Sequence, residues 1–212
     1  MRDINEVVEI IKILKDTYPD AKCSLDYKTP FELGIAVMLS AQCTDERVNI
    51  VTAVLFKKYN TPEGFMNINI EELERLIHSC GFYKNKAKNI KTYSEKIMNE
   101  YNGEVPKDME KLMSLPGIGR KSANVIMLEA FGVAKGIAVD THCKRIANRM
   151  GLSNESDPEK IEKDLLKIIP EEYYRDVNHL FIWHGRNTCD SRKPKCETCK
   201  ISKYCKFFSK NV

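Results

Sequence analysis

The segment Leu115–Val125, with the sequence LPGIGRKSANV, decides how this chain is interpreted. Its proline and two glycines predict a tight turn between two helices, where the glycine backbone can lie close to a ligand. The main-chain amides of Gly119, Arg120 and Lys121 would then stand at a helix N-terminus, which favours an anion such as a nucleic-acid phosphate. An ordinary interhelical turn has a similar composition, so the rest of the chain must separate the two interpretations.

The charge of the whole chain says little, but its distribution is informative. The 34 Lys and Arg residues against 30 Asp and Glu residues give a net charge of only +4. Between Arg186 and Lys210, eight basic residues accompany two acidic residues, so this segment alone carries +6. A solvated lysine-rich tail is the plain explanation, although these residues surround four cysteines.

The hydropathy of the chain indicates a cytoplasmic protein that does not enter a membrane. No apolar run approaches the ~20 residues that cross a bilayer, and the N-terminus lacks the apolar stretch of a signal peptide. In a reducing compartment the eight cysteines of the chain are not expected to form disulfides.

Apolar residues recur at helical spacing along the whole chain, and no segment alternates as a half-buried strand does, so we predict an all-α protein. Thr29-Pro30-Phe31-Glu32 predicts a capping box, and Asp45 and Asp140 are expected to cap helices. Thr61-Pro62 is expected to break the helix before it, and Gly185 is expected to end the last helix. The expected helices cover about 4–18, 31–42, 45–59, 69–77, 85–101, 108–114, 121–131, 141–150, 158–169 and 173–184.

Four cysteines near the C-terminus predict a metal centre. Cys189, Cys196, Cys199 and Cys205 lie within 17 residues in the pattern Cys-x6-Cys-x2-Cys-x5-Cys. Thiolates gathered this closely suit zinc or an iron–sulfur cluster. Zinc ribbons usually present paired CxxC motifs, and this chain has one, so the unequal spacing favours a bulky cluster without excluding zinc.

Lys121 and Asp140 are candidates for catalysis because each begins a helix next to a turn. Arg120 and the positive end of a helix favour a free amine on Lys121, which a Schiff-base nucleophile requires. A nearby carboxylate could orient that amine or take up protons. Each residue also has a simpler role, because Lys121 could only bind phosphate and Asp140 could only cap its helix.

Taken together in order, LPGIGRKSANV, VDTHCKR and HGRNTCDSRKPKCETCKISKYC resemble endonuclease III, as do LSAQCTD near residue 40 and GFYKNKA near residue 80. The resemblance implies a monomeric, nucleoid-associated DNA glycosylase and abasic-site lyase of the helix-hairpin-helix superfamily. It implies a helical barrel domain over 23–134, a discontinuous iron–sulfur domain over 1–22 and 135–212, and double-stranded DNA with damaged bases or abasic sites lying between them. It also implies a 4Fe-4S cluster on the four cysteines.

The resemblance also assigns roles to single residues. Lys121 would attack the sugar and form a Schiff base, and Asp140 would assist the attack and the proton transfers. Gln42 would fill the space of the flipped nucleotide, while Phe82 would be an apolar wedge or, equally well, an ordinary buried aromatic residue. The expected phosphate contacts come from the turn and from the cysteine loop, namely Gly117, Gly119, Arg120, Arg192, Lys193 and Lys195.

Two other functions share these motifs. A monofunctional mismatch glycosylase for adenine or thymine has the same fold, but such enzymes usually lack a lysine at the position of Lys121. A non-catalytic DNA-binding module would use Lys121 only to hold phosphate. Relatives often carry an acidic residue just before the turn where this chain has Met113-Ser114, so its lesion preference need not be theirs.

Overall fold

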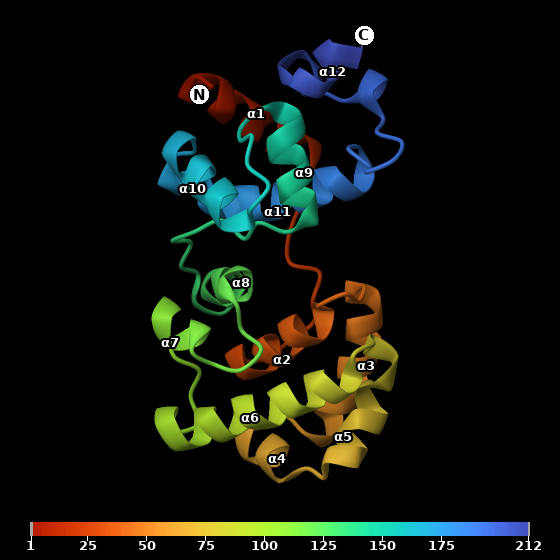
Figure 1. Ribbon diagram of the computed structural model, residues 1–212, viewed down its shortest axis with the longest axis vertical. Helices are drawn as coiled ribbons and strands as arrows, with labels where there is room; N and C mark the ends of the chain where they lie inside the picture. The colour runs from red at the N-terminus through yellow and green to blue at the C-terminus, as the bar shows by residue number, and fades with distance from the viewer. Residues whose placement is uncertain (1, 212) are drawn as a thin grey trace. The chain divides into compact units, whose positions relative to one another are not determined.

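The computed structural model describes residues 2–211, and over these residues every regular element is a helix, which confirms the all-α prediction (Figure 1). The chain forms two compact units, one over Ser24–Val133 and one that joins Met1–Cys23 to Ala134–Val212. Within the described part of the chain, no helix is both long and apolar enough to span a bilayer.

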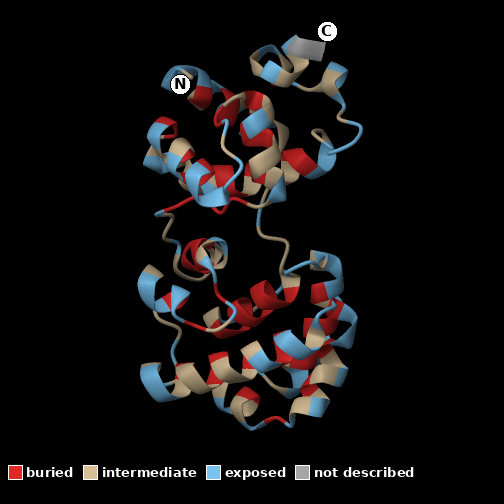
Figure 2. Ribbon diagram, viewed as in Figure 1, coloured by how far each residue is buried: buried red, intermediate tan, exposed pale blue. Residues whose placement is uncertain are grey.

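The unit over Ser24–Val133 is built around a helix that is buried on all sides. Helix α2 (Pro30–Ser40) is buried at every position from Phe31 to Leu39 (Figure 2), because it is apolar all round and other helices cover it. The other helices of this unit are α3 (Asp45–Lys58), α4 (Pro62–Asn67), α5 (Ile70–Ile77), η1 (His78–Cys80), α6 (Tyr83–Tyr101), α7 (Met109–Met113) and α8 (Arg120–Phe131).

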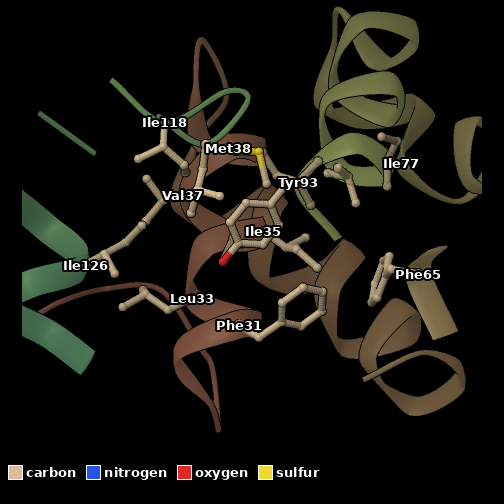
Figure 3. Close-up of a cluster of buried hydrophobic side chains, with 14 of the residues drawn as sticks. Phe31, Leu33, Ile35, Val37, Met38, Phe65, Ile77, Tyr93, Ile118 and Ile126 are labelled. Carbon is tan, nitrogen blue, oxygen red and sulfur yellow. The ribbon is translucent and has the colours of Figure 1, made fainter. Parts of the chain in front are cut away.

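Aromatic rings fix the packing of α2 against α4 and α6. The ring of Phe31 stacks on that of Tyr93, with centroids 5.4 Å apart, and meets the ring of Phe65 edge-on at 5.7 Å. Figure 3 shows these rings beside the aliphatic side chains of α2, with Ile118 and Ile126 from the turn and α8 on the other side. The turn that the sequence singled out is therefore anchored in the main core of this unit.

The predicted capping box starts α2, with one change of partner. Thr29 Oγ1 accepts the main-chain N–H of Glu32 at 3.1 Å, as expected. The Glu32 carboxylate reaches back to the main-chain N–H of Lys28 at 2.6 Å, one residue before the cap. Both bonds satisfy amides at a helix start that would otherwise be buried without partners.

The second unit packs its helices around α9 (Thr141–Met150), which contacts the three α-helices that follow it in the chain. The other elements are α1 (Ile4–Thr17), α10 (Pro158–Ile168), η2 (Glu171–Tyr173), α11 (Tyr174–Asn187), η3 (Cys196–Thr198), η4 (Ser202–Tyr204) and α12 (Lys206–Asn211). Three of these, η3, η4 and α12, lie in the cysteine-rich tail, where the apolar pattern predicted no helix.

Two expected features around residue 42 were wrong. Helix α2 ends at Ser40, and Gln42 lies outside it with φ of +53°. The cap of α3 is Thr44 rather than Asp45, because Thr44 Oγ1 accepts the N–H of Arg47 at 3.3 Å. Asp45 becomes the first helical residue, where its negative charge interacts favourably with the positive end of the helix.

The expected break at Thr61-Pro62 is confirmed, because α3 ends at Lys58, and Thr61 then caps the short helix α4. One expected helix boundary was wrong. Helix α11 continues through Gly185, where a Cβ would come within 2.7 Å of His142 Nδ1 on α9. Gly185 is therefore a position of close helix contact and not a stop signal.

Candidate functional site

The turn between α7 and α8 depends on one of its two glycines. Gly117 has φ of +77°, and a Cβ there would meet Met38 Sδ at 2.7 Å, so only glycine fits against α2. Gly119 has φ of −91°, which any residue adopts, so its backbone conformation does not require glycine. The place of a Gly119 Cβ has no heavy atom within 4 Å, so this side of the turn is open.

Arg120 and Lys121 are the first two residues of α8, directly after this open turn. Gly119 is the N-cap and offers no side chain to the amides of the first helical turn. A helix start of this kind carries a partial positive charge and attracts an anion. Lys121 is exposed beside it.

Asp140 lies in the other compact unit, where it caps α9. Its Oδ1 accepts the main-chain N–H of Cys143 at 2.7 Å, which confirms the predicted cap. The carboxylate is half-buried, and the cap engages one of its two oxygens. Its second oxygen gives the residue a means to take part in chemistry as well.

Gln42 and Phe82 share an unusual backbone conformation. Their φ angles are +53° and +46°, a region that L residues other than Asn and Asp rarely occupy. Phe82 is 66% exposed, so the interpretation of this ring as a buried aromatic was wrong. Two exposed residues with strained backbone conformations in one unit are typical of a ligand-binding site.

Lys86 belongs to the same region, and the sequence interpretation missed it. It is only 6% exposed, and its ammonium lies near the segments that carry Gln42 and Phe82. The signal was present, because Lys86, Ile90, Tyr93 and Ile97 follow helical spacing on the buried face of α6. A lysine within such an apolar stripe requires internal hydrogen-bond partners.

The four tail cysteines line one pocket together and form no disulfide. Burial raises the pKa of Cys196 and of Cys199, so both favour the thiol form unless a metal takes the place of the proton. Apolar side chains from α9 and α12, including Ile146, Met150 and Phe207, complete the walls. Over residues 2–211, no three His, Cys, Asp or Glu side chains are placed to hold a single metal ion. Thiolates gathered in one apolar-walled pocket suit a zinc ion or an iron–sulfur cluster.

Two side chains of this unit contact the sulfur atoms directly. Arg149 Nη1 lies 3.3 Å from Cys189 Sγ, and its guanidinium also stacks on the ring of Phe207. His184 Nε2 lies 3.8 Å from Cys199 Sγ, and burial lowers the pKa of His184 to about 4, which leaves the ring neutral near pH 7. The sequence interpretation gave neither residue a role, although His184 begins the motif that contains the four cysteines.

The basic loop between the first two cysteines is held by its neighbours. Asp190 Oδ1 accepts the main-chain N–H groups of Arg192 and Lys193 at 2.8 and 3.0 Å. These two bonds also lower the pKa of the Asp190 carboxyl, so it remains ionised. The side chains of Arg192, Lys193 and Lys195 are all exposed, so they are available to phosphates.

Comparison with known proteins identifies this set of features. Residues 35–171 match the model of the HhH-GPD superfamily of base excision DNA repair proteins. The endonuclease III of Synechocystis sp. is 50% identical over 197 residues, which cover 93% of this chain and 90% of the relative. The chain belongs to the endonuclease III family.

Two solved structures of endonuclease III have the same fold. One is a non-covalent endonuclease III–DNA complex, and the other is a trapped endonuclease III–DNA covalent intermediate. Each has a TM-score of 0.94 and 43% identity, and each match covers 100% of this chain and 99% of the other. The family-level prediction is confirmed, and the chain is a DNA glycosylase of base excision repair.

Proposed function

We propose that this protein removes oxidised pyrimidines from duplex DNA and cleaves the resulting abasic site through a Schiff base on Lys121. The observation that carries the proposal is an exposed lysine at the open start of α8, directly after the Gly117 turn, in a chain of the endonuclease III family. A relative that is 43% identical has been trapped as a covalent intermediate with DNA, which supports covalent chemistry.

The Lys121 amine attacks C1′ of the damaged nucleotide, and the C1′–N bond breaks as the base leaves. Loss of a proton from the amine and opening of the sugar ring give an imine between Nζ and C1′. Removal of a C2′ proton then expels the 3′ phosphate, and water hydrolyses the imine to free the lysine. The positive end of α8 favours the negative charge of a neighbouring phosphate during these steps.

Asp140 acts as the carboxylate of the reaction. It accepts a proton from the attacking amine or stabilises the positive charge that develops on the sugar. The hydrogen bond from Cys143 N–H fixes the orientation of the carboxyl group. The conformational entropy of this side chain is therefore lost on folding, and not in the reaction.

The remaining DNA contacts divide into two kinds. Gln42 and Phe82 enter the base stack, where Gln42 fills the place of the flipped nucleotide and Phe82 separates neighbouring bases. The start of α8, with Gly117, Gly119 and Arg120, holds phosphate, as do Arg192, Lys193 and Lys195 in the cysteine loop. Phosphate contacts add affinity and salt dependence but no choice of base.

Cys189, Cys196, Cys199 and Cys205 would hold a 4Fe-4S cluster, whose contribution is to cross-link the tail and present the basic loop. Four cysteines fill the four iron positions, so no position is left for a substrate. The shared pocket of the four cysteines and the contacts from Arg149 and His184 to sulfur support a thiolate-bound metal group here, and membership of the endonuclease III family favours the cluster over zinc.

Borohydride trapping tests the proposal. The purified protein is mixed with a duplex that carries one oxidised thymine, and borohydride reduces any imine to a stable amine. We expect a covalent adduct with the wild type and none with Lys121→Ala, although the variant still binds the duplex. The matched control is Lys163→Ala, which removes an exposed lysine on a different helix, α10. This variant should still form the adduct.

Each other outcome contradicts a different part of the proposal. Base release without an adduct would identify a monofunctional glycosylase. An adduct that persists in Lys121→Ala would place the nucleophile elsewhere. No base release from any lesion or mismatch, with binding retained, would leave a DNA-binding module without catalytic activity.

A further inference from the structure

We infer that Lys86 is a positioning residue that fixes the two base-stack segments, those of Gln42 and Phe82, in one arrangement before DNA arrives. Its side-chain ammonium donates to three main-chain carbonyl oxygens, those of Leu39, Ala41 and Cys80. The inference rests on the proposed roles of Gln42 and Phe82 and extends them to a residue that touches neither base nor sugar.

The three contacts come from two separate stretches of chain. Leu39 and Ala41 are at the C-terminal end of α2, and their oxygens lie 2.8 and 2.7 Å from Lys86 Nζ. Cys80 lies at the end of η1, and its oxygen is 2.8 Å from the same atom. Gln42 directly follows Ala41, and Phe82 is two residues after Cys80. One nitrogen therefore ties together the chain just before each strained residue.

The main chain of Lys86 adds a fourth contact to the same region. Its N–H donates to the carbonyl oxygen of Phe82 at 3.1 Å, the first hydrogen bond of α6. Phe82 is thus held from both sides, through the Lys86 backbone and through Cys80. This arrangement accounts for a non-glycine residue at φ of +46°, which persists only where its surroundings determine it.

The Lys86 ammonium is chemically suited to holding three main-chain carbonyl groups. An ammonium has three N–H donors, and here each has a carbonyl partner, so the buried charge is satisfied. The last carbonyls of α2 lack helical partners and carry partial negative charge, which favours a cation at this point. Burial lowers the pKa of Lys86, and the neighbouring Cys80 and Cys43 oppose that effect. Hydrogen bonds to the three carbonyl oxygens also favour the charged form.

A fixed arrangement matters for base flipping. The enzyme unstacks a base at a cost of a few kcal/mol, and side chains already in place recover that cost without further ordering. Without Lys86, the Gln42 and Phe82 segments would have to be ordered during flipping. The loss should therefore appear in the flipping and excision steps more than in the initial binding to phosphates.

The chain offers a matched control on the same helix. Lys91 Nζ donates to the carbonyl oxygens of Met66 and Ile68 at 2.9 and 2.6 Å, at the end of α4. Lys86→Met and Lys91→Met each remove an ammonium held by main-chain carbonyls and retain a side chain of similar length. Only Lys86 is bonded next to Gln42 and Phe82.

The test measures single-turnover excision at saturating enzyme, together with the fluorescence of 2-aminopurine beside the lesion as a report of unstacking. We expect Lys86→Met to lower both the excision rate and the fluorescence rise at least about tenfold, with a smaller change in affinity for undamaged duplex. Lys91→Met should retain both signals, and Lys86→Arg should recover part of the loss.

A double-mutant cycle keeps the inference testable if Lys86→Met is unstable. In a Gln42→Gly, Phe82→Ala background, Lys86→Met should cause little further loss of excision per folded molecule, because its targets are gone. Equal effects of Lys86→Met and Lys91→Met, or full additivity in the cycle, would overturn the inference. If the wild type excises no lesion, the proposed function itself fails, which is a separate result.

Discussion

Asp140 Oδ1 accepts the main-chain N–H of Cys143 at 2.7 Å, so the carboxylate proposed for catalysis also begins helix α9. The two roles are compatible because a cap uses one carboxylate oxygen. They are also separable by mutation, since asparagine caps a helix about as well as aspartate but cannot accept a proton in the same way.

Asp140→Asn should therefore lose activity without losing stability. We expect excision to fall by about 10²–10⁴-fold, the usual contribution of a general acid or base, while the free energy of unfolding changes by only a few tenths of a kcal/mol. Asp140→Ala should lose the same activity and about 1 kcal/mol of stability. Urea unfolding and single-turnover excision measure the two effects, and a stable, active Asp140→Asn variant would contradict the catalytic role.

Phe82→Gly should make the protein more stable and less active. Glycine relieves the strain at φ of +46°, so we expect a gain of about 1 kcal/mol in the free energy of unfolding. Excision should fall at least about tenfold because the wedge is absent. The matched control is Asn102→Gly, at the other end of α6 with φ of +53°, which should retain full activity. Unchanged excision by Phe82→Gly would show that the ring is not a wedge.

The two glycines of the turn should respond differently to alanine. Gly117→Ala introduces a Cβ 2.7 Å from Met38 Sδ at a positive φ, and should cost about 1–3 kcal/mol of stability. Gly119→Ala has ordinary φ and open space, so the fold should be unaffected while affinity for duplex DNA falls. Thermal unfolding and a binding titration separate them. Normal DNA binding by Gly119→Ala would show that no phosphate lies close to the main chain of Gly119.

Loss of any one of the four tail cysteines should remove the proposed cluster, and its iron, from the protein. We expect Cys199→Ala to lack the visible absorbance, iron and sulfide of the wild type, and to bind DNA more weakly because the basic loop is no longer held. Cys143→Ala, which truncates a buried thiol in α9, is the control and should retain the cluster. Zinc instead of iron in the wild-type protein, measured by elemental analysis, would contradict the cluster.

The sequence by itself determined what depends on neighbouring residues. Thr29 and Asp140 cap helices because a side-chain oxygen a few residues from an amide is a local arrangement. The sequence also predicted α2 as an apolar helix, and a helix that is apolar at most positions is suited to burial. The cysteine spacing indicated a metal centre for the same local reason, and the ordered motifs indicated the family.

The tertiary structure decided whatever depends on residues far apart in the chain. Gly185 was expected to end a helix, but contact with His142 places it inside α11. The positive φ of Gln42 and the exposure of Phe82 are properties of the folded chain that no local pattern predicted. The role of Lys86 also depends on the tertiary structure. The carbonyl oxygens that bind its ammonium lie up to 47 residues away in the chain, so the local sequence does not identify them.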